Sequence, residues 1–439
     1  MGLIAAKFGG SSAADGIQIR KIKAIVESDP ARRYVVVSAP GKRFSADNKI
    51  TDMLYLIKTQ IDIGAPYEQV MQVVKERYLG LEADLGVSVG IADEFAIIEE
   101  ELKKGATADY IASRGEFLSA KIVAAFLGYD FVDTAGLVLF NAKGRFQHDE
   151  TNAALAAGLE KHERAVLPGF YGTLPNGGIK TFSRGGSDIT GALVARAVRA
   201  DVYENWTDVS GFLMADPRIV ENPKGIKNIS YKELRELSYM GASVLHENAI
   251  YPARLAGIPI NIRNTNNPEA PGTFITAEDA SYSGQLITGI AGNKDFTVIG
   301  IYKNMMSNEI GYIKRILSIL EDYDIPIEHI PSGIDTVSLV ISDKYLEDKL
   351  GDLIEDFEKK LDADSIELFE NMSLIATVGH GMASVPGVAT RLFGSLTEAG
   401  VNIRMIDQGS SEMNIIVGVE TKDFETAIRA IYKAFVAKL

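Results

Sequence analysis

KFGGSS, residues 7 to 12, follows a short apolar run that begins at Leu3 and precedes a helical pattern that begins near Asp15. A glycine-rich turn between a strand and a helix can bind anions, because the helix N-terminus offers free N–H groups and a positive dipole end. The two glycines carry no side chain that would block a phosphate, the serines add donors, and Lys7 adds a cation. The P-loop spacing is absent, and a tight turn without a ligand is the alternative interpretation. The stretch therefore predicts an α/β domain with a candidate anion site near its start.

The rest of the first 265 residues continues this alternation of short apolar runs and longer helical stretches. Such alternation is typical of a mainly parallel sheet covered by helices. The predicted strands are Leu3 to Lys7, Tyr34 to Ser38, Ala165 to Leu167, Val202 to Asn205 and Pro259 to Arg263. A stretch rich in Asn, Pro, Ser and Gly follows, so we predict a first domain over residues 1–265 and a linker over residues 266–286.

The C-terminal region contains an internal repeat. GYIKRILSILEDYDIPIEHI starts at Gly311 and GVATRLFGSLTEAGVNIRMI starts at Gly387, an offset of 387 minus 311, or 76 residues. Each copy predicts a ferredoxin-like βαββαβ unit, whose open sheet edges favour pairing with a second copy. Chance similarity is the alternative, but the register holds through five elements. We predict two such units, over residues 287–370 and 371–439.

Composition excludes several classes of protein. At 439 residues the chain is large enough for two or three domains. A net charge of -14 argues against nucleic acid as a partner, and the absence of cysteine excludes disulfides and thiolate metal sites. No apolar run reaches the roughly twenty residues that a membrane-spanning helix needs, and the apolar start is too short for a signal peptide. We therefore expect a cytoplasmic protein with no membrane partner.

A second glycine-rich turn, SRGGSD at residues 183 to 188, also precedes a strong helical pattern. Ser187 could cap that helix, and the planar fork of Arg184 suits a carboxylate or a phosphate. Asp188 could belong to a polar site, or it could be a first-turn acid that favours the helix dipole. Two anion-binding turns in one domain indicate a phosphotransferase, because such an enzyme must hold two anionic reactants close together.

Two further motifs place polar residues where a pocket is expected. RGE, residues 114 to 116, lies inside a helical pattern, where glycine costs about 1 kcal/mol relative to alanine and so hints at a close approach. An exposed charge pair or a helix-packing glycine is the alternative. WTDVSGFLMADPR, residues 206 to 218, follows a predicted strand, and open α/β sheets bind ligands at the carboxyl ends of their strands. Trp206 is expected to pack rather than to stack on a base.

These four motifs in this order, followed by the repeat, resemble the aspartate kinases of the amino acid kinase superfamily over essentially the whole chain. SRGGSD with WTDV and a paired C-terminal unit carries most of the specificity. The resemblance implies a three-layer α/β/α amino acid kinase domain with a mainly parallel sheet, followed by two ferredoxin-like ACT units. IEHIPSGID, residues 327 to 335, resembles the lysine-sensitive monofunctional class.

The resemblance also implies roles for residues at matching positions. Those expected at ATP are Lys7, Gly9, Gly10, Ser11, Thr207, Asp208 and Arg218. Those expected at L-aspartate are Thr51 and Glu116, at its α-amino end, and Arg184, at its α-carboxylate. Lys7 and Asp188 would be catalytic, with Asp188 organising Lys7 and the transferring group. One position departs from the family pattern: GASVLHE, residues 241 to 247, has Ser243 where a nucleotide-contacting lysine is usual, which puts the details of ATP contact in question.

The implied activity is transfer of the γ-phosphoryl group of ATP to the β-carboxylate of L-aspartate. The product would be 4-phospho-L-aspartate, the first intermediate toward lysine, threonine and methionine. A carboxylate is already ionised at pH 7, so the reaction needs positioning and charge neutralisation rather than a general base. Mg²⁺ is expected to arrive with the phosphates of ATP and to keep several waters, so we predict no metal site made by side chains alone.

The resemblance implies regulation by an amino acid, lysine in preference to threonine. The residues expected at this effector are Met305, Glu328, Ser332 and Asp335. Glu328 suits an ammonium group. Paired ACT units also predict a homo-oligomer, either a dimer or a tetramer.

Two rival interpretations remain open at this point. Another amino acid kinase of the same fold could act on glutamate, acetylglutamate or carbamate, although the ACT pair and WTDVSGF argue against it. A catalytically weak amino-acid sensor is favoured only by Ser243. The retention of Lys7, Glu116, Arg184 and Asp188 argues against it. Activity on aspartate compared with glutamate would decide between them.

Overall fold

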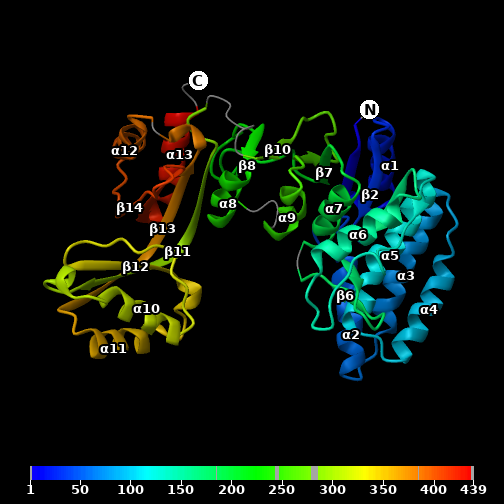
Figure 1. Cartoon of the computed structure of the whole chain (residues 1–439), viewed down its shortest axis with the longest axis horizontal. Helices are drawn as coiled ribbons and strands as arrows, with labels where there is room; N and C mark the ends of the chain where they lie inside the picture. The colour runs from blue at the N-terminus through cyan, green and yellow to red at the C-terminus, as the bar shows by residue number, and fades with distance from the viewer. Residues whose placement is uncertain (1, 184, 243–246, 278–284, 384, 437–439) are drawn as a thin grey trace. The chain divides into compact units, whose positions relative to one another are not determined.

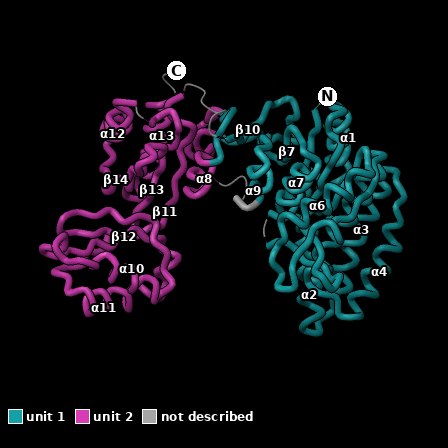
Figure 2. Tube along the Cα trace, in the orientation of Figure 1, with its two compact units in different colours: residues 1–212, 225–231, 244–281 teal, residues 213–224, 232–243, 282–439 magenta. Residues whose placement is uncertain are grey.

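A computed structural model of the chain (Figure 1) describes residues 2–183, 185–242, 247–277, 285–383 and 385–436. The chain forms two compact units (Figure 2). Unit 1 holds residues 1–212, 225–231 and 244–281, and unit 2 holds residues 213–224, 232–243 and 282–439. The finer domain boundaries expected from the sequence, at residues 265, 286 and 370, stay predictions.

Unit 1 is built on an eight-stranded sheet with the strand order β3-β4-β2-β1-β7-β9-β10-β8. Neighbouring strands run parallel except β9 and β10, which are antiparallel. The strands are β1 (Ile4–Phe8), β2 (Arg32–Val37), β3 (Asp130–Phe131), β4 (Ala165–Pro168), β7 (Val202–Thr207), β8 (Asn228–Ser230), β9 (Ile260–Asn264) and β10 (Thr273–Thr276), with β5 (Tyr171–Thr173) and β6 (Ile179–Thr181) in a separate ribbon. The five predicted strands are confirmed, each to within two residues at either end.

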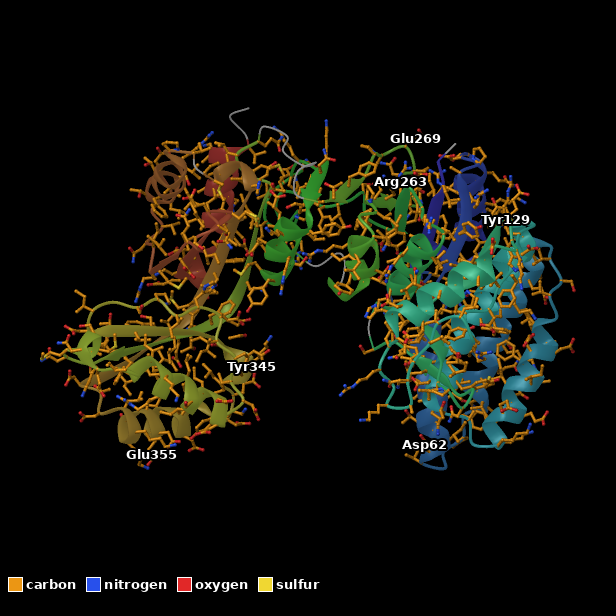
Figure 3. All side chains as sticks on the ribbon, viewed as in Figure 1. Asp62, Tyr129, Arg263, Glu269, Tyr345 and Glu355 are labelled. Atoms are coloured by element: carbon orange, nitrogen blue, oxygen red, sulfur yellow. The ribbon has the colours of Figure 1, made fainter. Side chains whose placement is uncertain are left out.

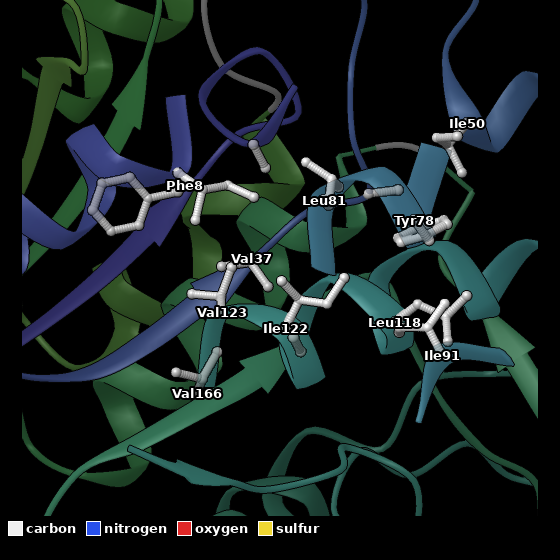
Figure 4. Close-up of a cluster of buried hydrophobic side chains, with 14 of the residues drawn as sticks. Phe8, Val37, Ile50, Tyr78, Leu81, Ile91, Leu118, Ile122, Val123 and Val166 are labelled. Carbon is white, nitrogen blue, oxygen red and sulfur yellow. The ribbon is translucent and has the colours of Figure 1, made fainter. Parts of the chain in front are cut away.

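Helices cover both faces of this sheet. They are α1 (Gly16–Glu27), α2 (Ile50–Asp62), α3 (Glu68–Leu85), α4 (Ile91–Lys103), α5 (Ala108–Leu127), α6 (His148–Leu159), α7 (Gly186–Ala197) and α9 (Glu247–Leu255), with a short 3₁₀ helix η1 (Ser11–Ala13). Phe8, Val37 and Val166 lie in one buried cluster with side chains from α1 to α5 (Figure 4). Because side chains alternate along a strand, Lys7 points to the opposite face, where it pairs with Asp188 on α7. The α/β/α kinase-like architecture with a mainly parallel sheet is therefore confirmed.

Unit 2 is built on a five-stranded antiparallel sheet with the order β12-β11-β13-β15-β14. Its strands are β11 (Gly289–Tyr302), β12 (Thr336–Ser342), β13 (Ser365–Val378), β14 (Met405–Asp407) and β15 (Asn414–Glu420). Its helices are α10 (Tyr312–Asp322), α11 (Leu350–Leu361), α12 (Val388–Glu398) and α13 (Phe424–Phe435), with most of α8 (Tyr231–Tyr239) and the 3₁₀ helices η3 (Met306–Asn308), η4 (Asp343–Tyr345), η5 (His380–Met382) and η6 (Thr421–Asp423).

Two long strands run through both ferredoxin-like halves of unit 2. β11 and β13 have 14 residues each and pair with one another along their length. Phe296–Tyr302 of β11 also pairs with β12, whereas Met372–Val378 of β13 pairs with β15. Each half therefore takes one end of each long strand and adds its own helices.

The predicted repeat is confirmed in the first helix of each half. α10 begins at Tyr312 and α12 at Val388, which are 388 minus 312, or 76, residues apart. Each helix is preceded by a glycine in the left-handed region, Gly311 with a φ of 85° and Gly387 with a φ of 90°. An L side chain is strained in that region, so the glycines define where both helices begin. The next long strands, β12 and β15, begin 414 minus 336, or 78, residues apart, so the connection is two residues longer in the second half.

Candidate active site

Lys7 and Asp188 form the centre of the candidate site in unit 1. β1 brings Lys7 to the carboxyl end of the sheet, where Nζ lies 2.6 Å from Oδ1 of Asp188 and the lysine is 6% exposed. Nδ2 of Asn205, on β7, donates to the same carboxylate oxygen at 2.8 Å. The Tyr203 hydroxyl donates to the backbone carbonyl of Asp188 at 3.0 Å. These contacts hold a buried cation in one place, which is what stabilisation of phosphoryl charge requires.

The KFGGSS turn approaches the neighbouring backbone too closely for side chains. A Cβ atom on Gly10 would lie 3.0 Å from the carbonyl oxygen of Ala39, and one on Gly41 would lie 2.7 Å from the carbonyl carbon of Gly10. A Cβ on Gly9 would lie 3.4 Å from Nζ of Lys7, so glycine there keeps the space above the ammonium group free. The turn therefore exposes backbone beside a cation, as the sequence predicts for an anion site.

The serines and the helix that follow this turn have separate roles. Ser11 is half-buried and begins η1, whereas the hydroxyl of Ser12 is buried and lies 2.7 Å from that of Thr265. Asp15 caps α1 by accepting a hydrogen bond from the Gln18 N–H at 2.9 Å. The expected helix start near Asp15 is confirmed. The Ser12 hydroxyl makes its hydrogen bonds within the protein, to Thr265 and to the Trp206 carbonyl.

The RGE motif lies on α5, and its glycine permits a close approach. A Cβ atom on Gly115 would lie 2.8 Å from Cβ of Ala39, in the loop after β2. Glu116 is 4% exposed, and its Oε2 atom has no hydrogen-bond partner among the described residues. Burial raises the pKa of Glu116 to about 8, although backbone N–H groups and the charge of Lys7 act against this rise. An ammonium group from a ligand would favour the ionised form of Glu116 and would supply the donor that its unpartnered oxygen lacks.

Thr51 lies at the beginning of α2, close to this same loop. It is half-buried, and the preceding Ile50 N–H donates to the Pro40 carbonyl at 3.2 Å. The loop from Ala39 to Gly41 thus borders three elements: the KFGGSS turn, helix α5 with its RGE motif, and the start of α2. The structure brings Lys7, Gly10, Thr51, Glu116 and Asp188 to one end of the sheet of unit 1.

The SRGGSD turn leads into α7, but Ser187 does not cap this helix. The N-cap residue is Gly185, in the left-handed region with a φ of 60°, and the helix makes no side-chain capping hydrogen bond. The expectation that Ser187 caps α7 is therefore wrong, because the helix begins one residue before it and Ser187 lies buried in the first turn. Arg184 lies outside the described residues, as does Ser243.

The start of the WTDV segment is held by packing and by a buried charge network. Trp206 is buried, and its ring stacks on that of Phe8 with centroids 5.9 Å apart, so the expected packing role is confirmed. Its Nε1 donates to Glu204 at 2.8 Å, and Glu204 is also paired with Arg32 at 2.7 Å and with Arg263 (Figure 3) at 3.3 Å. Sequence reasoning missed this network, because the partners are far apart in the chain.

The residues expected at the nucleoside are divided between the two units. Thr207 ends β7 and its hydroxyl donates to Oδ1 of Asp208 at 3.1 Å, at the carboxyl end of the sheet that carries Lys7. Arg218 belongs to unit 2, where its exposed guanidinium pairs with Asp216 at 2.6 Å. A nucleotide contact for any of the three stays a prediction.

The four residues expected at an effector lie on two adjacent segments of unit 2. The segment from Met305 to Asn308 contacts the end of the IEHIPSGID segment, because the Ser307 N–H donates to the Ile334 carbonyl at 3.1 Å. The Lys303 N–H donates in the same way to the Asp335 carbonyl at 2.9 Å. Met305, with a φ of 59°, and Asp335 are therefore close neighbours.

Glu328 and Ser332 lie beside β12. The Glu328 N–H donates to the Val340 carbonyl at 2.9 Å, and Ser332 pairs with Val337 in an antiparallel bridge. The carboxylate of Glu328 accepts a hydrogen bond from the hydroxyl of Tyr239, at the end of α8. Sequence reasoning did not single out Tyr239.

Within residues 2–436, apart from the gaps given above, there is no cluster of three or more His, Asp or Glu side chains arranged to hold a metal ion. No helix in this part of the chain combines the length and the apolar character needed to cross a membrane.

Comparison with known families agrees with this geometry. A model of the amino acid kinase family matches residues 2–264, and a model of the ACT domain matches residues 375–435. The first match covers more than half of the chain and contains the Lys7–Asp188 centre. The chain belongs to the amino acid kinase family.

Relatives that match over the full length narrow this assignment. Aspartokinase 3 of Bacillus subtilis is 39% identical over 446 residues, covering 98% of each chain. The crystal structure of the Clostridium acetobutylicum aspartate kinase is 50% identical with a TM-score of 0.93, covering 99% of this chain and 100% of that chain. Within its family the chain therefore groups with the aspartokinases, and it is an ATP-dependent phosphotransferase with a carboxylate acceptor.

Two structures of E. coli aspartokinase III match with lower identity. The complex with aspartate and ADP is 25% identical with a TM-score of 0.74, covering 98% of this chain and 99% of that chain. The complex with lysine and aspartate is 25% identical with a TM-score of 0.74, covering 99% of both chains. Both likenesses extend over units 1 and 2.

Proposed function

We propose that the chain transfers the γ-phosphoryl group of ATP to the β-carboxylate of L-aspartate and releases 4-phospho-L-aspartate and ADP. The observation that carries this proposal is the buried Glu116 carboxylate, whose unpartnered oxygen suits the α-amino group of an amino acid. Thr51 would assist at that group, and Arg184 would bind the α-carboxylate. The complex of the E. coli relative with aspartate and ADP supports aspartate and an adenine nucleotide as the ligands.

The residues of the chain would contribute mainly charge neutralisation and positioning. An oxygen of the aspartate β-carboxylate attacks the γ-phosphorus, and the bond to the β–γ bridging oxygen breaks, so that ADP leaves with the electron pair. Lys7 offsets negative charge on the transferring group, and Asp188 holds Lys7 in place through the 2.6 Å contact. Backbone N–H groups at Gly10 and Ser11 would bind phosphate oxygens. The Gly9 N–H donates to the Trp206 carbonyl at 3.0 Å, so Gly9 would contribute by leaving room for a phosphate beside Lys7.

The nucleotide would bring Mg²⁺ with it. The residues present fit a metal that arrives with ATP. Lys7 and the side-chain-free turn at Gly9 suit a phosphate group, whereas they offer no ligands to a bare cation. The metal would neutralise charge on the phosphates when bound. Thr207 and Asp208 would meet the nucleoside, and Arg218, further along the same segment of the sequence, would also bind the nucleotide.

Unit 2 would sense lysine and inhibit the reaction. Glu328 would bind an ammonium group of the effector, with Met305, Ser332 and Asp335 around the rest of the molecule. The lysine complex of the E. coli relative supports lysine over threonine. Exposed apolar residues along α10, Ile313 and Leu317, would cover one another in a homo-oligomer formed through the ACT units. We place this enzyme in the cytoplasm, at the first step toward lysine, threonine and methionine.

The decisive experiment traps the acyl phosphate. Purified chain is incubated with MgATP, aspartate and hydroxylamine, with glutamate as the control acceptor and with lysine or threonine added separately. We expect aspartyl hydroxamate to form at least about 100-fold faster than the glutamate product, because the acceptor pocket fixes the distance between the amino group and the reacting carboxylate. Lysine is expected to reduce the rate.

Other outcomes would redirect the assignment. Equal rates with glutamate would reject aspartate specificity. Lysine binding without any hydroxamate, in protein with a cooperative thermal transition, would support an amino-acid sensor in place of a kinase.

A further inference from the structure

Arg77, on α3, is a buried arginine to which the catalytic assignment gives no role. Its side chain is 5% exposed, and its guanidinium donates to three backbone carbonyls, those of Ala14, Gly41 and Asn48. The donor–acceptor distances are 3.2 Å for Ala14 and 3.0 Å for Asn48. Nη1 also lies 3.1 Å from Oδ2 of Asp47. Because the rigid guanidinium fork has five donors, it can bind several segments at once where lysine cannot.

The three carbonyls belong to segments that frame the active site. Ala14 follows the 3₁₀ helix of the KFGGSS turn, and Gly41 lies in the loop after β2. Asn48 precedes Lys49, the N-cap of α2, and this helix carries Thr51. The Gly41 N–H also donates to the Gly10 carbonyl at 2.7 Å. The Arg77 side chain therefore connects the KFGGSS turn to the loop that leads to Thr51, a residue proposed to bind aspartate.

The same loop contacts the helix that carries Glu116. Ala39 lies against Gly115, where a Cβ atom would come within 2.8 Å, and its backbone N–H interacts with the Glu116 carboxylate. The position of this loop thus affects the distance between the KFGGSS turn, where ATP would bind, and Glu116, where aspartate would bind. In group transfer the reacting atoms must lie roughly 3–3.5 Å apart, and a displacement of about 1 Å can cost about 100-fold in rate.

We propose that Arg77 is a positioning residue for phosphoryl transfer, which fixes the distance between the ATP turn and the acceptor site by clamping Ala14, Gly41 and Asn48. The inference rests on the proposed function, in which these two sites hold ATP and aspartate. A residue that only stabilised the fold would change the melting temperature but not the turnover of folded enzyme.

Two substitutions of Arg77 and one control test the proposal in the full chain. Arg77→Lys keeps the charge but cannot reach all three carbonyls, and Arg77→Met removes the donors. We expect kcat with MgATP and aspartate to fall about 100-fold in Arg77→Lys and further in Arg77→Met. The KM for aspartate and the dissociation constant of ADP should change by less than about threefold.

Arg43→Lys is the matched control. Arg43 also pairs with Asp47, at 2.9 Å, but its side chain is 44% exposed and, among the described residues, its guanidinium hydrogen bonds go to Asp47 alone. This variant should retain turnover within about twofold of the wild type, because it leaves the clamp on the three carbonyls intact. If Arg77→Lys turned over within about threefold of Arg43→Lys, the positioning role would be overturned.

Amide hydrogen exchange separates this inference from the proposed function. In Arg77→Lys the Gly41 amide should exchange at least about tenfold faster than in the wild type, because its partner segment is no longer held. Wild-type protein that formed no aspartyl hydroxamate would reject the proposed function alone. An unchanged exchange rate of the Gly41 amide in Arg77→Lys would reject the positioning role of Arg77, whichever amino acid accepts the phosphoryl group.

Discussion

The catalytic cluster of unit 1 and the effector segments of unit 2 differ in how deeply their side chains are buried. Lys7 and Glu116 are 6% and 4% exposed, whereas Met305 and Ile334 are 61% and 74% exposed. A buried, fixed set of polar groups needs little rearrangement when the reaction occurs. An exposed segment can gain order and contacts when a ligand binds, and this difference in affinity is what shifts a conformational equilibrium. Catalysis and regulation thus place opposite demands on the two units.

The hydrogen bonds of the two regions show the same contrast. Asp188 receives Lys7 and the Asn205 amide, so its charge is matched within unit 1 before any ligand arrives. Glu328 instead receives the hydroxyl of Tyr239, a neutral donor that an ammonium group could displace. Burial and the nearby Glu328 carboxylate raise the pKa of Tyr239 to about 12, so this hydroxyl stays protonated and available as a donor at neutral pH.

The largest effect is expected from Lys7→Met, which would remove the cation from the buried catalytic cluster of unit 1. We expect kcat to fall by about 1,000-fold or more, because a fixed cation at the transferring group is lost. Removing one partner of a buried ion pair also costs about 3–5 kcal/mol, so Lys7→Met with Asp188→Asn serves as the folding control. Hydroxamate formation is the measurement. A kcat within tenfold of the wild type would show that Lys7 is not at the reacting phosphate.

Glu116→Gln is expected to change the pH dependence of stability. Burial raises the pKa of Glu116 from 4.5 in the unfolded chain to about 8, so between these values the folded protein holds a proton that the unfolded chain has released. The free energy of unfolding should therefore fall as pH rises through this window, by at most about 5 kcal/mol. The variant should lack this loss. Urea unfolding at pH 6 and pH 9 checks this.

The control for this measurement is Glu94→Gln, which removes a carboxylate from the half-buried pair with Lys121 on the same unit. It should keep the pH dependence of the wild type. If the wild type and Glu116→Gln lost stability in parallel between pH 6 and pH 9, the buried carboxyl group would not be the cause.

The smallest effect is expected from Tyr239→Phe, on the exposed side of the comparison. Loss of the competing hydroxyl should lower the inhibition constant for lysine about two- to fivefold, the size of one exposed hydrogen bond. Tyr323→Phe is the matched control, because its hydroxyl donates to Asp356 at 3.1 Å, outside the effector segments. Weaker inhibition in Tyr239→Phe than in Tyr323→Phe would contradict a competition for Glu328.

Sequence reasoning found what local patterns encode. The strand before KFGGSS, the glycine that lets α5 approach Ala39, and the start of α12 at Val388 each follow from short-range periodicity or glycine placement. β8 and β10 were missed, because strands of three and four residues carry too little alternation to stand out. Nor does alternation specify partners, so the sharing of β11 and β13 by both halves of unit 2 was not foreseen.

Part of the candidate site was equally hidden. Arg77 stands in the run VVKERYLG, where Lys75, Glu76 and Arg77 look alike as members of a solvated helix face. Only the packing of α3 against three distant loops distinguishes Arg77 from its neighbours. The Arg32–Glu204 pair, 172 residues apart, is hidden for the same reason.

The two strands that pass through both halves of unit 2 limit how its sensing modules can be recombined. A chimera that exchanges one ACT half for that of a relative must be joined inside both β11 and β13, since no loop separates the halves along these strands. On β11 the least disruptive junction is the register shift between Asn293 and Phe296. On β13 it is the opposing segment near Asn371, whose φ of 57° already interrupts the strand pairing. Effector specificity in this architecture should therefore be exchanged between relatives through paired junctions at these irregularities.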